Sequence, residues 1–204
     1  MVSKERLSGL IDGVIAVIMT IMLLEFRIPS DGSVISFLKE NLVYAIAYIL
    51  SFIYVVVSWY NQQYMMRHSE RVTRRIYIAC MLWVLSLSLL PVLAAWTGRT
   101  INLFKNFGAG SPKAPALLFL LMICLWGYAY LHMTKVFIAD NPGEKGDLIS
   151  KMEVYRYLRR RFFAFGIAIS FVIAWFYPPF VFAYTAGEML FALSRSRNNM
   201  DFEK

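Results

Sequence analysis

Long apolar stretches alternate with short charged connections along the chain. The first four stretches hold 20–22 residues each, enough for an α-helix to cross a hydrocarbon core of about 30 Å. Two shorter stretches follow. The pattern predicts an all-α, polytopic membrane protein, a single domain over residues 1–204 with six transmembrane helices. We expect the spans at residues 7–28, 41–60, 76–96, 115–135, 162–177 and 180–193.

The last two apolar stretches are joined only by Pro178 and Pro179. Proline lacks a backbone N–H and restricts the residue before it, so this pair predicts a tight reversal between two short helices. One long kinked helix is the alternative. The sizeable connection before them, residues 138–161, carries an Asn-Pro-Gly turn signal. Residues 145–161 are expected to form one short interfacial helix.

The distribution of charge indicates how the chain lies in the membrane. The protein is 59% hydrophobic, and its 21 Lys and Arg residues flank the apolar stretches instead of forming one basic surface; we therefore expect no nucleic-acid partner. Sixteen of the 21 fall on the same side as the N-terminus. The positive-inside rule then predicts a multi-pass protein of the cell inner membrane with both termini in the cytoplasm.

Aromatic residues gather near the ends of the predicted spans. We interpret them as a belt at the level of the lipid headgroups, without a role in function. They are Trp59, Tyr60, Trp96, Trp175 and Tyr177.

The first predicted helix differs from the others because it has few aromatic residues and contains an acid, Asp12. At 100° per residue, one narrow stripe of this helix carries basic, small, hydroxylic and aliphatic residues. Asp12 lies about 100° away from the stripe and is expected to face a neighbouring helix. The stripe predicts either a pore lining or a packing face between helices. Its residues are Arg6, Gly13, Val17, Thr20, Leu24 and Arg27.

Three short motifs resemble one family. The first is Arg6-x5-Asp12-Gly, followed by Thr20 and by the exit Leu24-Glu25-x3-Pro29. The second is Trp59-Tyr-Asn-Gln-Gln, and the third is Leu90-Pro91. Together they resemble the transmembrane protein 175 family, lysosomal potassium channels and their prokaryotic single-repeat relatives. The chain departs from the family pattern where Leu10-Ile11 replaces Phe-Ser and where two glutamines replace two histidines.

The resemblance implies a homotetramer in which the first helix of each subunit lines a central pore. It implies a potassium-preferring cation channel without a carbonyl selectivity filter, with K⁺ and other monovalent cations as permeant ions and the lipid bilayer as surroundings. Val17, Thr20, Ile21 and Leu24 would form the constriction and select the ion.

The resemblance also implies a polar network that holds subunits together, formed by Arg6, Asp12 and either Gln62 or Gln63. Glutamine does not titrate, so a pH response that depends on the replaced histidine is not expected here.

Two other functions compete with a channel. A secondary cation or proton-coupled transporter would use Glu188 in the last helix, although an ion pair with Arg195 or a place near the interface also accounts for that residue. An enzyme is not expected, because His68 and His132 are the only histidines, neither makes a metal-ligand motif, and no Ser-His or paired-Asp arrangement stands out. We expect no cofactor and no metal other than the permeating ions.

Overall fold

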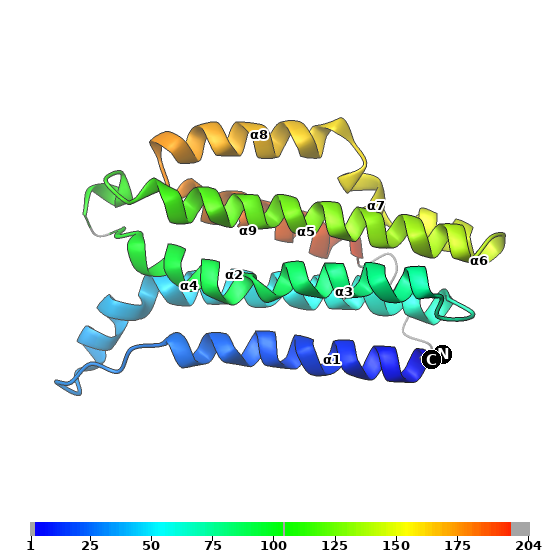
Figure 1. Ribbon diagram of the computed structural model, residues 1–204. Helices are drawn as coiled ribbons and strands as arrows, with labels where there is room; N and C mark the ends of the chain where they lie inside the picture. The colour runs from blue at the N-terminus through cyan, green and yellow to red at the C-terminus, as the bar shows by residue number, and fades with distance from the viewer. Residues whose placement is uncertain (1–2, 104, 197–204) are drawn as a thin grey trace.

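The computed structural model describes residues 3–103 and 105–196, which form helices and connections without strands. Figure 1 shows the long helices lying roughly side by side in one bundle. In chain order the helices are α1 (Lys4–Ile21), the 3₁₀ turn η1 (Met22–Glu25), α2 (Val34–His68), α3 (Arg74–Ser88), α4 (Leu90–Thr100), the 3₁₀ turn η2 (Asn106–Gly108), α5 (Lys113–Asp140), α6 (Glu144–Ser150), α7 (Glu153–Leu158), α8 (Arg161–Phe176) and α9 (Phe180–Ser196).

Within the described part of the chain, four stretches are long and apolar enough to cross a membrane: Lys4–Glu25, Val34–His68, Arg74–Thr100 and Lys113–Asp140. They contain most of the first four predicted spans. Two shorter apolar helices, Phe163–Phe176 and Phe180–Ser194, correspond to the last two. The second stretch is much longer than predicted, because its 35 helical residues rise about 52 Å. Its ends therefore extend beyond a hydrocarbon core of about 30 Å.

The third predicted span is broken into α3 and α4 at Leu89. Pro91 explains the break, since it has no N–H to donate to the preceding turn. The break lets α4 pack closely on α2. A side chain on Gly98 would place its Cβ 3.0 Å from the Cα of Tyr44 and 3.1 Å from the Cβ of Ala47. Glycine is therefore what permits this approach.

The chain reverses between α8 and α9 as the proline pair predicts, and the two helices pack against each other. The prediction of one interfacial helix at residues 145–161 is wrong. That segment forms two helices, α6 and α7, separated at Lys151 and Met152. Both pack on the bundle, α6 on α2 and α5, and α7 on α5, α8 and α9. Ile149 and Met152 are almost fully buried, so core packing decided the path of this segment.

Helix α1 lies along one edge of the bundle (Figure 1) and contacts α2, α3 and α4. Only 28% of its most apolar window is buried, against 56% for the windows in Arg74–Thr100 and in α5. One face of this apolar helix is therefore not packed against any other helix of the same chain.

Candidate ion pathway on the first helix

The first helix has a packed face and an uncovered face. The packed face carries large aliphatic residues spaced three or four apart, so they lie above one another on one side of the helix. Each is at most 4% exposed, and each belongs to the main core. These residues are Leu7, Ile11, Ile15, Ile18 and Met22.

The four predicted pore residues lie on the uncovered face. Val17 is 58% exposed, Ile21 is 45% exposed and Leu24 is 81% exposed. Thr20 is exposed between them. Gly13 continues the face toward the N-terminus, with open space where a Cβ would point. The packed face therefore fixes the rotation of α1, and this rotation turns the predicted stripe away from the bundle.

The Thr20 hydroxyl is bound to its own helix. Its Oγ1 donates to the Ala16 carbonyl oxygen at 2.9 Å and approaches that of Val17 at 3.2 Å. A hydroxyl has one donor and two acceptor lone pairs. Because the hydroxyl proton is bonded to the backbone, the lone pairs of the Thr20 oxygen remain free. They can accept a hydrogen bond or coordinate a cation on the uncovered face.

Asp12 faces α2, as its angle on the helix predicts. Its Oδ1 accepts from Nε1 of Trp59 and from Nε2 of Gln63, both at 2.7 Å. The Gln63 amide also lies 3.4 Å from the Ser8 hydroxyl. Asp12 is thus held by two donors from the neighbouring helix and is only partly exposed.

The other two residues of the predicted polar network lie elsewhere within the chain. Gln62 is fully buried, and its amide lies beside the Cys80 thiol of α3. Arg6 is exposed near the start of the uncovered face. The structure therefore brings Asp12 and Gln63 together, and places Gln62 and Arg6 apart from them.

The C-terminal end of the first helix is held by α2 and α4. At η1 the helix tightens into a 3₁₀ turn, which carries Leu24. The Tyr44 hydroxyl donates to the Met22 carbonyl oxygen. The Arg99 guanidinium binds the Glu25 carbonyl oxygen, lies 3.0 Å from the Glu25 carboxylate and sits 5.7 Å from the centre of the Tyr44 ring.

The backbone just after η1, at Arg27, is held by the side-chain amide of Asn41. Asn41 accepts from the Arg27 N–H and donates to the Arg27 carbonyl oxygen, both at 2.8 Å. Phe26 packs edge-on against Tyr44 with 5.0 Å between ring centres. These contacts and those of Tyr44 and Arg99 fix where the exposed Leu24 side chain stands.

The opposite end of α1 is tied to the end of α2. The Lys4 ammonium donates to the carbonyl oxygens of Arg67 and Ser69, at 3.2 and 2.8 Å. These carbonyls lie at the C-terminal end of α2, where a positive charge interacts favourably with the helix dipole. Nearby, the Lys145 ammonium lies 2.9 Å from the Glu70 carboxylate and lowers the pKa of that carboxyl.

The sequence did not identify several of these residues. Trp59 was interpreted as part of the headgroup belt, but its indole N–H binds Asp12. Its place in the Trp-x-Asn motif was the available signal. Nothing in the pattern pointed to Tyr44, Asn41 or Arg99, because they come from other helices, α2 and α4, whose packing on the first helix the sequence does not show.

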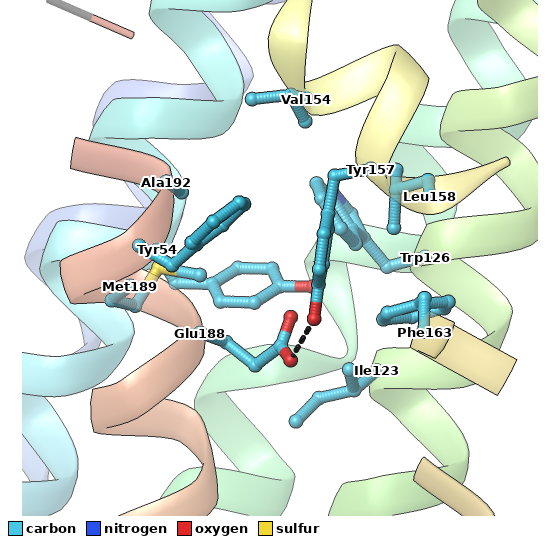
Figure 2. A pocket seen from close by; sticks show the side chains of 11 residues that line it. Tyr54, Ile123, Trp126, Val154, Tyr157, Leu158, Phe163, Glu188, Met189 and Ala192 are labelled. Atoms are coloured by element: carbon cyan, nitrogen blue, oxygen red, sulfur yellow. Dashed lines mark hydrogen bonds between the residues drawn. The ribbon is translucent and has the colours of Figure 1, made fainter. Parts of the chain in front are cut away.

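Glu188, the residue of the competing transporter hypothesis, does not lie at the α1 face. It lines a pocket among α2, α5, α7, α8 and α9, where it accepts a hydrogen bond from Tyr157 (Figure 2). The side chain of Arg195 lies outside the described residues, so the predicted ion pair between the two stays a prediction.

Comparison with known proteins gives a consistent set of relatives. Residues 6–91 match the family model described as endosomal/lysosomal potassium channel TMEM175. A potassium channel of Chryseobacterium sp. (strain P1-3) is 34% identical over 179 residues, which are 86% of this chain and 85% of that protein. The crystal structure of a lysosomal potassium-selective channel TMEM175 homolog from Chamaesiphon minutus matches with a TM-score of 0.74 at 16% identity, over 95% of this chain and 97% of that one. The last comparison bears on the fold alone.

Proposed function

Because this chain belongs to the TMEM175 family of potassium channels, we propose that it forms a homotetrameric, potassium-preferring cation channel whose pore is lined by α1. The observation that carries the proposal is the uncovered face of α1. Val17, Thr20 and Ile21 stand exposed on α1 and Leu24 on the turn η1 that continues it, while the opposite face is packed into the core. Around a symmetry axis, one such face per subunit would enclose a path.

The proposed constriction uses side chains instead of carbonyl groups. Val17 and Leu24 would form aliphatic collars, which resist entry of water and gate by dewetting. The Thr20 ring between them would offer one hydroxyl oxygen from each subunit to a partly dehydrated cation. Ile21 would narrow the same level of the path. Thr20 suits this role because its proton is already bonded to the Ala16 carbonyl.

Assembly is proposed to use the polar residues at the start of α1. Asp12 is oriented by Trp59 and Gln63 of its own chain. Arg6 is exposed and available to a neighbouring subunit. A buried ion pair between subunits would set their register, and loss of one partner would leave the other charge uncompensated.

We propose that α8 and α9 also cross the membrane, which would give six spans in one domain. Both termini would then lie in the cytoplasm and the protein in the cell inner membrane. The distribution of Lys and Arg supports this orientation. In Figure 1 the start of α1 and the end of α9 lie toward the same end of the bundle, as an even number of crossings requires.

Selectivity is tested by bi-ionic reversal potentials of the purified protein in planar bilayers. Thr20→Val keeps the side-chain volume but removes the oxygen, so the K⁺/Na⁺ permeability ratio should fall. Thr100→Val is a matched control, because the Thr100 hydroxyl is half-buried on α4 and donates to the Trp96 carbonyl at 2.8 Å in the same way. An equal ratio in wild type and Thr20→Val would contradict the proposed role of Thr20.

Conductance tests the aliphatic collars in the same recordings. Val17→Ala and Leu24→Ala should widen and wet the path and raise the current. Leu85→Ala is the control, since Leu85 is 61% exposed on α3 and lies outside the proposed pore. If neither α1 variant changes the current, the stripe is a packing face and the pore lies elsewhere.

The same recordings separate a channel from a coupled transporter. A channel gives a current that follows the K⁺ gradient without a second ion, whereas a proton-coupled transporter shifts its reversal potential when only the proton gradient changes. A reversal potential that tracks pH at fixed K⁺ would favour the transporter and direct attention to Glu188.

A further inference from the structure

Helix α8 is shorter than the hydrocarbon core that it crosses in the proposed six-span arrangement. Its 16 residues rise about 24 Å, against about 30 Å for the core. The end of α8 lies level with the start of α5, because the Lys113 ammonium stands 4.7 Å from the centre of the Trp175 ring. The whole shortfall of α8 against α5 therefore falls at the N-terminal end of α8.

The N-terminal end of α8 stops near the middle of α5. A Cβ on Gly127 would lie 3.3 Å from the ring of Phe163, in the first turn of α8, and 3.8 Å from the side chain of Leu158, at the end of α7. Thirteen further residues of α5, or about 20 Å of helix, lead from Gly127 to Asp140. Figure 1 shows the same offset, since α5 continues past the start of α8 toward α6. The corner between α7 and α8 thus lies deeper in the bundle than the end of α5.

Four arginines are placed at this corner. Residues 153–161 contain one acid, Glu153, so they carry three net positive charges. Glu153 pairs with Arg156 at 3.1 Å. The Arg159 guanidinium lies 5.6 Å from the centre of the Tyr155 ring. Arg159 and Arg160 are exposed, and neither belongs to an ion pair among the described side chains. We call the four residues the arginine corner: Arg156, Arg159, Arg160 and Arg161.

The surface of α8 next to the arginine corner is apolar. Phe165 is 65% exposed and Val172 is 61% exposed, so lipid chains cover this face in the proposed arrangement. A charged side chain at this depth is costly unless it meets a counter-charge or water. The first N–H groups of α8 also lack a side-chain acceptor, because Arg160 occupies the N-cap position and caps none of them. Free guanidinium groups and free N–H groups at one place favour an anion there.

We propose that the arginine corner binds the phosphate of an anionic phospholipid from the cytoplasmic leaflet, whose headgroup is drawn inward beside α5. A hydrophobic stretch that is too short for the core thins the bilayer locally, which brings phosphates toward the end of the helix. Arginine binds phosphate through two parallel N–H groups, so Arg159 and Arg160 suit this role. The proposal rests on the proposed crossing of α8 but not on the pore.

The net charge of the arginine corner selects the class of lipid. A zwitterionic headgroup carries its own cation, which balances its phosphate and would be repelled by the three net positive charges. The headgroup of phosphatidylglycerol has no such cation. Its acyl chains would lie along the exposed apolar face of α8, so the lipid would satisfy the arginines and cover Phe165 at once. A free phosphate ion would do only the first.

The test is a lipid titration of the intact protein in detergent, followed by native mass spectrometry. Phosphatidylglycerol and phosphatidylcholine with identical acyl chains are added separately, and bound lipid per subunit is measured. Phosphatidylglycerol should reach half-saturation at a concentration at least about ten-fold lower. The variant Arg159→Ala/Arg160→Ala should raise that concentration about 30-fold, because each arginine near an anionic lipid contributes about five-fold in affinity. Both side chains are exposed, so the fold should survive.

The matched control removes the same charge at the end of the bundle. Arg71 and Arg74 are exposed and stand outside the described ion pairs. Arg71→Ala/Arg74→Ala should leave the half-saturation concentration of phosphatidylglycerol within about two-fold of wild type. Thr20→Val, in the proposed pore, should not change it either. Failure of the pore proposal and failure of this site therefore give different results.

Three outcomes overturn the proposal. The first is equal binding of phosphatidylglycerol and phosphatidylcholine by wild type. The second is equal weakening by the two double variants, which would mean that the whole basic surface attracts lipid without a site at α8. The third is displacement of the lipid by sodium phosphate at the same concentration as by added phosphatidylglycerol, which would indicate a site for a free anion. If the Arg159 and Arg160 double variant does not fold, Arg160→Ala alone decides, with an expected loss of about five-fold.

Discussion

The contact between α1 and α2 at Asp12 makes a quantitative prediction. Asp12→Ala removes an acceptor that takes two hydrogen bonds of 2.7 Å, from the Trp59 indole and from the Gln63 amide. Trp59→Phe keeps an aromatic ring but removes one of the donors. The two variants and their combination form a double-mutant cycle, which isolates the energy of the single contact between Asp12 and Trp59.

The expected magnitude follows from the kind of bond and its surroundings. A hydrogen bond to a charged group contributes about 1.5–3 kcal/mol in soluble proteins. Measured side-chain hydrogen bonds inside membrane proteins average about 0.6 kcal/mol and reach about 1.7 kcal/mol. Asp12 is partly exposed, so the lower range applies. We expect Asp12→Ala to lower the free energy of unfolding by about 2 kcal/mol, Trp59→Phe by about 1 kcal/mol, and a coupling energy of about 1 kcal/mol.

The assay is equilibrium unfolding in mixed micelles of detergent and dodecyl sulfate, followed by circular dichroism at the helix band. Trp175→Phe is the matched control, because Trp175 is 52% exposed on α8 and contacts Lys113 instead of α1. Its cycle with Asp12→Ala should give no coupling. A coupling energy for Asp12 and Trp59 below about 0.3 kcal/mol would refute the view that this bond orients α1 against α2.

Three further variants test the ends and the surroundings of α1. Tyr44→Phe removes the hydrogen bond to the Met22 carbonyl and should loosen the turn that carries Leu24, raising single-channel current at an unchanged K⁺/Na⁺ ratio; an unchanged current would show that the tyrosine does not position the turn. Gly98→Ala places a Cβ 3.0 Å from the Tyr44 backbone and should therefore destabilise the protein by about 1–3 kcal/mol. An unaltered melting temperature would contradict the close approach of α2 and α4. Arg6→Ala should lower the fraction of tetramer in native mass spectrometry, whereas a wild-type fraction would exclude Arg6 from the assembly contact.

The parts of the fold that were predicted from the sequence depend on short-range geometry. Hydrophobic length predicted the apolar helices, and the Pro178-Pro179 pair predicted the reversal between α8 and α9. The sequence also predicted that Val17, Thr20 and Leu24 lie on one face, because the 3.6-residue period of a helix sets the angles between its own residues. The same geometry turned Asp12 toward a neighbouring helix. None of these predictions needed knowledge of a distant segment.

Tertiary packing decided the features that depend on how two or more helices meet. The sequence left Gln62 and Gln63 as equal candidates, but the two point about 100° apart on α2, and only the rotation of α2 against α1 brings Gln63 to Asp12. Likewise, Tyr44 and Arg99 meet the η1 turn from α2 and α4. Side chains from five helices, two of them far from α9 in the chain, create the surroundings of Glu188. Hydrophobic periodicity shows which face of a helix is buried, but not which residue of another helix will stand opposite, because that depends on the packing of all the side chains between them.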